Sequence, residues 1–577
     1  MHSHTDFSHR RTRLLIFFLD LLFICIIVRL FYWQILHRST LQAQAQDQYS
    51  RTVSLEGHRG KIFTSDGYPL VTNKTVYRLS LRPTILKEKP KAIAAELAPL
   101  LLESSSARQS QQQLQDMIET KLSDPKIKWL TLKTNISSDT KQKIDALHVF
   151  GATLDPYEIR DYPEASMAAH VTGFVGKDKD GNDQGYFGIE GKLDRELKGH
   201  TEQQTFLKDA LGFHLLFDQA TTATQTDGRD VVLTLHRDVQ HAVEEMLQQG
   251  MEKYKASAGE AIVMDPKTGK IIAMADFPRY TQSNFYDYPA ALYKNPALTE
   301  TYEPGSTFKL ITVAAGLETK KITPETVCAN CASARHIDTY TIRTWNDQYH
   351  PNITMNDALA KSDNVAMIFV AELLGKERFL KYVHLFGIGD PTQIELQEDT
   401  GSPIRKDWKF IDLATGSFGQ GIVTSGIQMV RAVGAIANHG MMMRPTIIEK
   451  VHDNSQNADV LVQPIEERQV ISPETAAALA KMMVYAVDTG EAHWTASKTH
   501  AAAGKTGTAQ VPIAGHYDAT NTIASFIGFA PPENPRFVML IKLRSPQTSP
   551  WAAETAAPLW FQIANKLFLL LNIPPDR

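Results

Sequence analysis

Cysteine is scarce in this chain, which has three cysteines among 577 residues. So few cysteines exclude the disulfide framework that holds many small secreted domains together. Two of them, Cys328 and Cys331, form a lone Cys-x-x-Cys pair, which can be a local disulfide, two free thiols or half of a metal site. A zinc site would need further ligands, and only His336 is close in the sequence. We expect no cofactor, and no metal at the functional site.

An excess of charge of either sign is also absent. The formal net charge is -4 at pH 7, with 21% charged residues, so no basic field favours binding to nucleic acid. The hydrophobic content of 43% is ordinary for a globular protein. A chain of this length is expected to fold as about three to four units, although one large domain can take the place of two.

The amino terminus does carry one long and mostly apolar run, residues 14–36. This run can cross roughly 30 Å of hydrocarbon, which predicts a single transmembrane helix in the inner or plasma membrane. Three arginines within residues 10–13 predict that residues 1–13 lie in the cytoplasm and the rest of the chain outside. A cleaved signal peptide is the alternative, but it would have a shorter apolar core and a small-residue cleavage site, whereas this run closes on Arg29, Phe31, Tyr32 and Trp33.

Charges interrupt the apolar run at Asp20 and Arg29. Charges within a span are costly, so they usually face another helix or lie near an interface. They indicate a partner within the membrane or, for Arg29, a side chain that reaches back to the interface.

Two regions follow the apolar run, and we place the boundary between them close to Arg229. The first, residues 37–228, mixes strands and helices without βαβ regularity. The second, residues 229–577, has predicted strands near both ends and helices between them. This order predicts an α+β domain whose sheet joins distant segments of the chain. The expected elements are helices over 91–102, 114–122, 238–250 and 554–571, and strands over 231–235, 259–265, 270–275, 523–530 and 536–543.

Three short motifs stand out in the second region: Ser306-Thr307-Phe308-Lys309, Ser362-Asp363-Asn364 and Lys505-Thr506-Gly507-Thr508. Each is weak alone, because Ser-x-x-Lys is common in long chains, where it usually marks a solvated helix face. Their order is informative, since penicillin-binding proteins and class A β-lactamases carry this set of motifs.

The first motif fits an activated serine. Pro304-Gly305 breaks the chain before Ser306 and an apolar run follows, so we expect Ser306 at the start of a buried helix. Lys309 lies one turn later on the same face. Its amine can accept the serine proton if burial or a neighbouring cation lowers its pKa.

The second motif is expected on a loop between two helices. There Ser362 can pass a proton to a leaving amine, and Asn364 can hold a substrate amide. The alternative is purely structural, because Ser362 or Asp363 can equally cap the amino terminus of a helix.

The third motif reads as a strand of small residues, where Gly507 allows another backbone to approach closely. Lys505 and Thr506 would bind a terminal carboxylate of a paired peptide. The backbone N–H groups of Ser306 and Thr508 would form an oxyanion hole, worth roughly 3 kcal/mol per donor. The alternative for Lys505 is a plain surface lysine.

With these residues in view, the chain resembles class B penicillin-binding proteins almost from end to end. The resemblance implies a transmembrane helix, an elongated mixed α/β pedestal over 37–228, and a transpeptidase-like domain over 229–577 with an antiparallel sheet flanked by helices. Two positions depart from the family pattern: His236 stands where aspartate is common, and Ser425 where proline is common. Further segments that look like the family's own are Arg59-Gly60, Asp66-Gly67, 160–163, 185–190, 302–305, 419–422, 437–440 and 503–505.

The resemblance also implies an activity. The family attacks the terminal D-Ala-D-Ala bond of a peptidoglycan stem peptide, releases D-alanine and transfers the acyl group from serine to an amine on a neighbouring stem, and β-lactams acylate the same serine. Division-type members are more similar than elongation-type members, because residues 185–190 follow 173–176 without a long insertion. The implied partners are a separate polytopic glycan polymerase and membrane proteins of the division complex.

Other functions use the same serine. A D,D-carboxypeptidase passes the acyl group to water, and a β-lactamase hydrolyses the antibiotic, but no convincing Glu-x-x-x-Asn lies between Ser362 and Lys505 for class A deacylation. A non-catalytic β-lactam sensor or wall scaffold is a further alternative. It is disfavoured because only about a dozen residues precede the span and no motif is missing.

Overall fold

The computed structural model describes residues 4–103, 110–199, 201–207, 227–513 and 516–577. The chain divides into two compact units. One comprises residues 1–57 with 199–227, and the other comprises residues 58–198 with 228–577.

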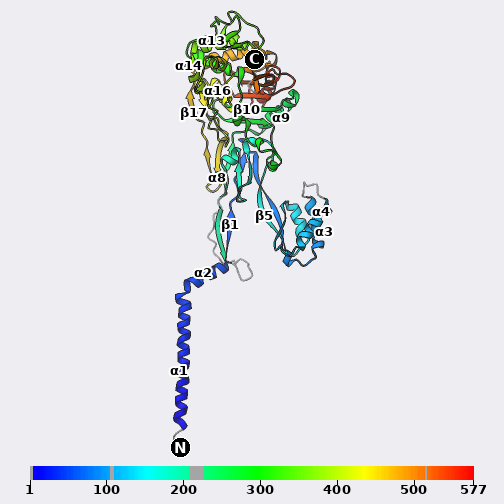
Figure 1. The fold of residues 1–577 in the computed structure, drawn as a ribbon, viewed down its shortest axis with the longest axis vertical. Helices are drawn as coiled ribbons and strands as arrows, with labels where there is room; N and C mark the ends of the chain where they lie inside the picture. The colour runs from blue at the N-terminus through cyan, green and yellow to red at the C-terminus, as the bar shows by residue number, and fades with distance from the viewer. Residues whose placement is uncertain (1–3, 104–109, 200, 208–226, 514–515) are drawn as a thin grey trace. The chain divides into compact units, whose positions relative to one another are not determined.

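The first unit is built on a long helix, α1 (His4–Phe31), which runs into a π-helical turn, η1 (Tyr32–Leu36). The apolar stretch Arg11–Leu36 has 26 residues and is long and apolar enough to cross a membrane. At 1.5 Å per residue its length is about 39 Å. This matches the span expected over 14–36 and is consistent with a single-pass anchor (Figure 1). The unit also holds α2 (Arg38–Tyr49) and an antiparallel pair of strands, β1 (Ser50–Glu56) and β8 (Thr201–Leu207).

The second unit begins with a small α/β region centred on a long strand, β3 (Pro69–Leu81). This strand pairs antiparallel with β4 (Leu130–Ile136) and with β5 (Ala152–Asp161). Helices pack beside these strands around a core that includes Leu79, Leu97 and Ile118. The helices expected over 91–102 and 114–122 are present, and the helices of this region are α3 (Pro90–Glu103), α4 (Gln111–Ser123) and α5 (Ser138–Asp145).

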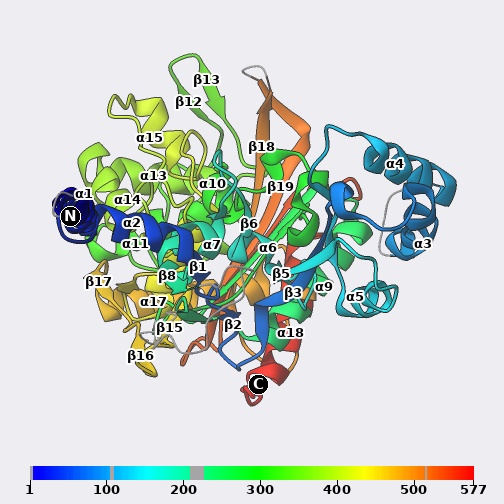
Figure 2. The ribbon, with the colours of Figure 1, turned by 90° about the horizontal axis from the view of Figure 1, so that it is seen from below.

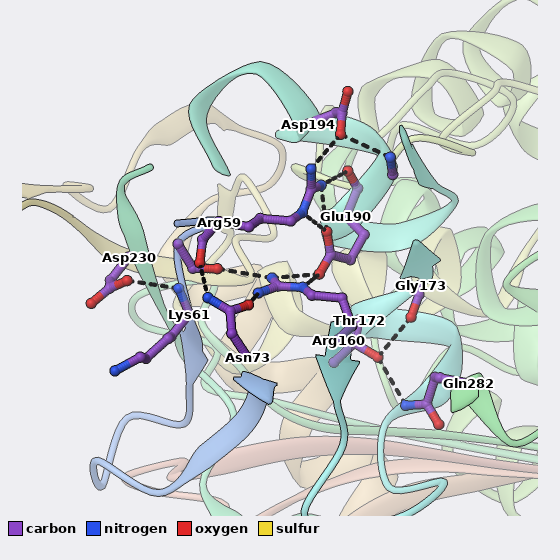
Figure 3. Close-up of polar contacts among 12 residues, drawn as sticks. Arg59, Lys61, Asn73, Arg160, Thr172, Gly173, Glu190, Asp194, Asp230 and Gln282 are labelled. Carbon is purple, nitrogen blue, oxygen red and sulfur yellow. Dashed lines mark hydrogen bonds and ion pairs between the residues drawn. The ribbon is translucent and has the colours of Figure 1, made fainter. Parts of the chain in front are cut away.

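A buried ion cluster joins the family-like segments of this region (Figure 3). Glu190, on the short helix α7 (Gly188–Lys192), is fully buried between two arginines. Arg160 donates to its Oε1 from Nε (2.8 Å) and Nη2 (2.6 Å), and Arg59 donates to its Oε2 from Nε (2.8 Å). Arg160 also reaches Asn73 (2.6 Å), and Arg59 pairs with Asp194 (2.7 Å). One buried carboxylate thus holds together segments that are far apart in the sequence.

One sheet crosses the predicted boundary near Arg229. Strand β2 (Ile62–Phe63) pairs antiparallel with β3 and parallel with β9 (Asp230–Leu233), which in turn pairs with β15 (Ile448–Asp453). Backbone hydrogen bonds therefore link residues before and after the boundary. The position of the domain boundary itself stays a prediction.

The five-stranded antiparallel sheet of the second unit has the strand order β11-β10-β20-β19-β18. Figure 2 shows two of its strands, β18 and β19, side by side. The apolar side chains of the sheet form two cores, one on each face, and helices from distant parts of the chain cover both. The predicted α+β class is therefore correct. The strands are β10 (Ala258–Met264), β11 (Ile271–Phe277), β18 (Ala503–Ile513), β19 (His516–Ala530) and β20 (Phe537–Arg544), and the covering helices include α9 (Arg237–Tyr254), α11 (Lys309–Glu318), α16 (Gly426–Ala437) and α18 (Ala556–Leu570).

The expected end of α9 at Gly250 is wrong, because the helix continues to Tyr254 and is capped by Lys255 in the left-handed conformation (φ 52°). A Cβ at Gly250 would lie 2.5 Å from a methyl carbon of Leu559 on α18. The glycine therefore permits close packing of two helices and does not end one.

Two positions left open by the sequence take defined forms. Cys328 and Cys331 are buried and joined as a disulfide, and no group of three potential metal ligands occurs among the described residues. Ser425 caps α16 in a capping box with Gln428, so this departure from the family pattern still starts a helix.

Candidate active site

Ser306 lies in a tight 3-10 turn, η5 (Gly305–Phe308), that leads directly into the buried helix α11. Gly305 takes a positive φ of 55°, and a Cβ there would lie 3.2 Å from the carbonyl oxygen of Thr508. The turn therefore packs against the strand of the third motif. The predicted interruption of the chain before Ser306 and the buried helix after it are both present.

The first two motifs and Lys505 meet at the hydroxyl of Ser362. This hydroxyl donates to Oγ of Ser306 at 2.9 Å. It is also bonded by Nζ of Lys309 (3.2 Å) and by Nζ of Lys505 (3.1 Å), and Lys309 donates in addition to the carbonyl oxygen of Ser362 (2.6 Å). Ser306 is partly exposed, whereas the other three side chains are buried. The cluster thus joins a reachable hydroxyl to two sheltered amines.

Burial lowers the pKa of both lysines. The pKa of Lys309 lies well below its usual value because of burial first and the neighbouring Lys505 second, with Asp363 and Glu491 opposing this shift. Burial also lowers the pKa of Lys505, and Glu491 opposes it. A desolvated amine next to a second cation is a suitable proton acceptor.

The Ser362-Asp363-Asn364 segment links α12 (Met355–Ala360) to α13 (Asn364–Leu374), as expected of a loop between helices. The helix cap is Asp363, whose Oδ1 accepts from the backbone N–H groups of Val365 (2.8 Å) and Ala366 (3.0 Å). Ser362 takes a positive φ of 56°, a strained conformation for serine, which turns its hydroxyl toward Ser306. Asp363 is therefore the capping residue, and the role of Ser362 in proton transfer stays a prediction.

Asn364 begins α13, and its side-chain amide donates to the carbonyl oxygen of Arg343 at 3.0 Å. The segment around Arg343 therefore packs against the second motif. Neighbouring Trp345 donates to the carbonyl oxygen of Lys361 (3.4 Å) and meets Trp551 edge-on, with 5.3 Å between ring centroids. Both tryptophans are exposed, at 47% for Trp345 and 40% for Trp551, and nothing in the motif pattern indicated them.

The third motif occupies β18, which ends the strand order of the sheet. In its register with β19, Lys505 faces Ile527 and Gly507 faces Ser525. A Cβ at Gly507 would lie 2.7 Å from both Thr307 and Ser525, so only glycine lets the serine turn pack here. A strand at the end of a sheet can accept a peptide as a further strand.

The remaining residues of this motif are fixed by polar contacts. Thr506 accepts from Nζ of Lys505 at 3.0 Å, and Thr508 accepts from the backbone N–H of Ala552 at 3.1 Å. The proposed oxyanion donors, the N–H groups of Ser306 and Thr508, belong to segments that touch at Gly305. The structure therefore brings the predicted residues of this strand together with Ser306, and their roles remain predictions.

A cavity of about 770 Å³ extends along β18 beyond Thr508. It lies between the sheet and the segment before Ser306, and its size falls in the range of ligand sites. Its lining includes Tyr302, Glu303, Gln510, Lys542 and Arg544. Sequence reasoning missed this cavity, because it forms from segments that are distant in the chain.

Glu491 is the other residue that sequence reasoning missed. It follows α17 (Pro473–Thr489) and lines a small cavity with Lys505 and Thr506. Its Oε1 is buried and has no hydrogen-bond partner among the residues that the structure describes. Nothing in the local sequence connects it to the three motifs.

Comparison with known proteins gives two family matches. The penicillin-binding protein transpeptidase domain matches residues 259–568, and the penicillin-binding protein dimerisation domain matches residues 54–233. Stage V sporulation protein D of Bacillus subtilis is 32% identical, with 98% of this chain and 87% of that protein covered. Peptidoglycan D,D-transpeptidase FtsI of Buchnera aphidicola is 26% identical, with 100% and 98% covered.

Solved structures show the same fold. Penicillin-binding protein 3 from Mycobacterium tuberculosis, solved with aztreonam, matches with a TM-score of 0.69 at 23% identity, covering 91% of this chain and 98% of that one. Penicillin-binding protein 2X from Streptococcus thermophilus matches with a TM-score of 0.72 at 21% identity, covering 91% and 81%.

Proposed function

The chain belongs to the class B penicillin-binding proteins, and we propose that it is a serine-type peptidoglycan D,D-transpeptidase acylated at Ser306. The observation that carries this proposal is the hydroxyl of Ser362, bonded at once to Ser306, Lys309 and Lys505. Relatives named peptidoglycan D,D-transpeptidase match nearly the whole chain, which supports the same reaction.

The first half of the proposed reaction forms an acyl-enzyme. Neutral Lys309 takes the proton of Ser306, directly or through Ser362, as Oγ of Ser306 attacks the carbonyl carbon of the terminal D-Ala-D-Ala bond. The backbone N–H groups of Ser306 and Thr508 stabilise the oxyanion. Ser362 then delivers a proton to the nitrogen of the departing D-alanine.

The second half transfers the acyl group to an amine of a neighbouring stem peptide. The attacking amine loses a proton to the same lysine and serine pair, and Ser306 recovers its proton when the ester breaks. A β-lactam undergoes only the first half of the reaction. Its ring opens when it acylates Ser306, and the leaving nitrogen stays attached to the rest of the molecule, so no group departs.

Substrate binding is assigned to the third motif and Asn364. Lys505 and Thr506 bind the terminal carboxylate, Asn364 holds a backbone amide, and the free edge of β18 pairs with the peptide. Gly507 lets the serine turn pack against this strand. The cavity beyond Thr508 gives the rest of the stem peptide room.

We assign residues 1–13 to a cytoplasmic tail, 14–36 to the membrane anchor, 37–228 to the pedestal and 229–577 to the extracytoplasmic transpeptidase domain. We infer a role in septal wall synthesis, supported by the short connection between 173–176 and 185–190 and by similarity to FtsI. The expected partners are a polytopic glycan polymerase and membrane proteins of the division complex, which the charges in the span would contact.

Fluorescent penicillin tests the proposal. The full chain in detergent should form a stable covalent adduct, seen by gel fluorescence and intact mass, and Ser306→Ala should form none. Ser455→Ala, at an exposed turn, is the matched control and should label like the wild type.

Absence of an adduct on the wild type would refute the proposal. An adduct lost within seconds would instead indicate a β-lactamase, and release of D-alanine without cross-linking to an added stem peptide would indicate a carboxypeptidase.

A further inference from the structure

Two amines share one buried hydroxyl at the centre of the site. Nζ of Lys309 and Nζ of Lys505 both lie within hydrogen-bond distance of Oγ of Ser362, at 3.2 Å and 3.1 Å. Two ammonium groups at such a position would repel each other with little water to screen them. The proposed chemistry needs them to differ, because Lys309 acts as a neutral base and Lys505 binds a carboxylate as a cation.

Few charged groups face this pair. Asp363 lies near Lys309, and its Oδ1 is occupied by two backbone N–H groups at the start of α13. Glu491 lines the same small cavity as Lys505, and among the described groups it is the only carboxylate whose charge raises the pKa of Lys505. His493 lies nearby on the same segment, where its ring contacts the carbonyl oxygen of Gly490 (2.9 Å).

Glu491 lies where Lys505 needs an oppositely charged neighbour. Its buried Oε1 lacks a hydrogen-bond partner among the described residues, and its side chain lines the same small cavity as Lys505 and Thr506. This cavity has room for about one water molecule, which could bridge a carboxylate and an ammonium group. Without such a bridge, an unpaired buried acceptor destabilises the folded protein.

We propose that Glu491 is a positioning residue whose negative charge keeps Lys505 as an ammonium ion and so leaves Lys309 as the neutral base. This inference rests on the proposed function, since it assigns opposite protonation states to two lysines of that site. The position of this single carboxylate then explains why one lysine is protonated and the other, which is chemically identical, is neutral.

The charge of Glu491 should appear in the pH profile of acylation. Bell-shaped profiles report an essential base and an essential acid. Removing the carboxylate lowers the pKa of Lys505 further, so its cation is lost at a lower pH. Lys309 is affected less, because Glu491 lines the same small cavity as Lys505, whereas Lys309 does not border it. The alkaline limb should therefore move toward neutral pH more than the acidic limb does.

The experiment compares Glu491→Gln with the wild type in the full chain. The second-order rate of acylation by a carboxylate-bearing penicillin is measured from about pH 6 to about pH 10. Glu491→Gln should lose about tenfold more at the alkaline end than at neutral pH. Glu491→Asp keeps the charge and should retain the alkaline limb. Glu474→Gln removes an equal charge from the exposed start of α17 and is the matched control.

Two results would overturn the inference. One is an alkaline limb in Glu491→Gln that coincides with that of the wild type, and the other is a loss that is uniform across pH, which indicates packing alone. Glu491→Thr also removes the charge and replaces the glutamine variant if that variant unfolds. Failure of the wild type to acylate would refute the proposed function itself, so the two failures are distinguishable.

Discussion

Replacing Glu190 by glutamine should destabilise the second unit strongly, although Glu190 lies outside the candidate active site. Glu190 has no exposed surface, and the arginines that hold it are only 5% (Arg160) and 11% (Arg59) exposed. Breaking a buried ion pair by removing one partner costs about 3–5 kcal/mol, because the remaining charge stays buried and uncompensated. Arg59 keeps Asp194 at 2.7 Å, so we expect the lower part of this range, about 3–4 kcal/mol.

Thermal unfolding of the full chain in detergent measures this loss. At about 2–4 °C per kcal/mol, the midpoint should fall by about 6–16 °C. The matched control is Asp347→Asn, which breaks an i,i+4 pair with Arg343 whose side chains are about 60% exposed, and it should change stability by less than about 0.5 kcal/mol. Equal midpoints for the two variants would refute the claim that burial sets the strength of the cluster.

The remaining predictions concern the sheet and the serine turn. Burial, and then the neighbouring Glu260, raise the pKa of Asp276 well above its usual value, so the folded state holds a proton that the unfolded state loses above about pH 4. The free energy of unfolding of the wild type therefore falls as the pH rises above about 4. In urea unfolding, Asp276→Asn should become more stable relative to the wild type between pH 5 and pH 8. Gly507→Ala should abolish penicillin labelling, because the added methyl meets Thr307 at 2.7 Å, and an unchanged labelling rate would contradict this packing.

Much of the second unit could be predicted because its signals are local. Short apolar runs mark the strands, and Pro304-Gly305 places the first motif at a helix start. The end of α9 was wrong for a physical reason. A glycine that ends a helix and a glycine that lets a neighbouring helix approach look the same in one sequence, and only the position of Leu559 separates them.

Contacts between distant segments could not be read from the sequence. The parallel pairing of β2 with β9 joins residues about 170 positions apart, and no local pattern encodes it. Glu491 is a second example, because only the folded chain brings the segment after α17 next to Lys505 and Thr506 on β18. Sequence motifs therefore identified the candidate reacting groups, whereas Glu491, whose charge we propose sets the protonation of two of them, became visible only in the folded chain.

A row of residues across the sheet shows how the serine turn is supported from outside the three motifs. In register, Asp276 on β11 faces Glu260 on β10, and Glu260 faces Lys542 on β20, with which it forms an ion pair. Nζ of Lys542 lies 4.8 Å from the ring centroid of Tyr302. Tyr302 precedes the serine turn and is tied to Thr424 by two backbone hydrogen bonds of 2.9 and 3.0 Å.

The same row continues to the motif strand. Lys542 faces Ser525 on β19, and Ser525 faces Gly507, whose carbonyl oxygen accepts from the Ser525 hydroxyl at 3.3 Å. The turn that carries Ser306 is therefore held between Tyr302 on one side and Gly507 on the other, and both contacts lead back to Lys542. Because catalytic groups must be held to within about 0.5 Å of their productive positions, we expect these supporting residues to be needed for placing Ser306.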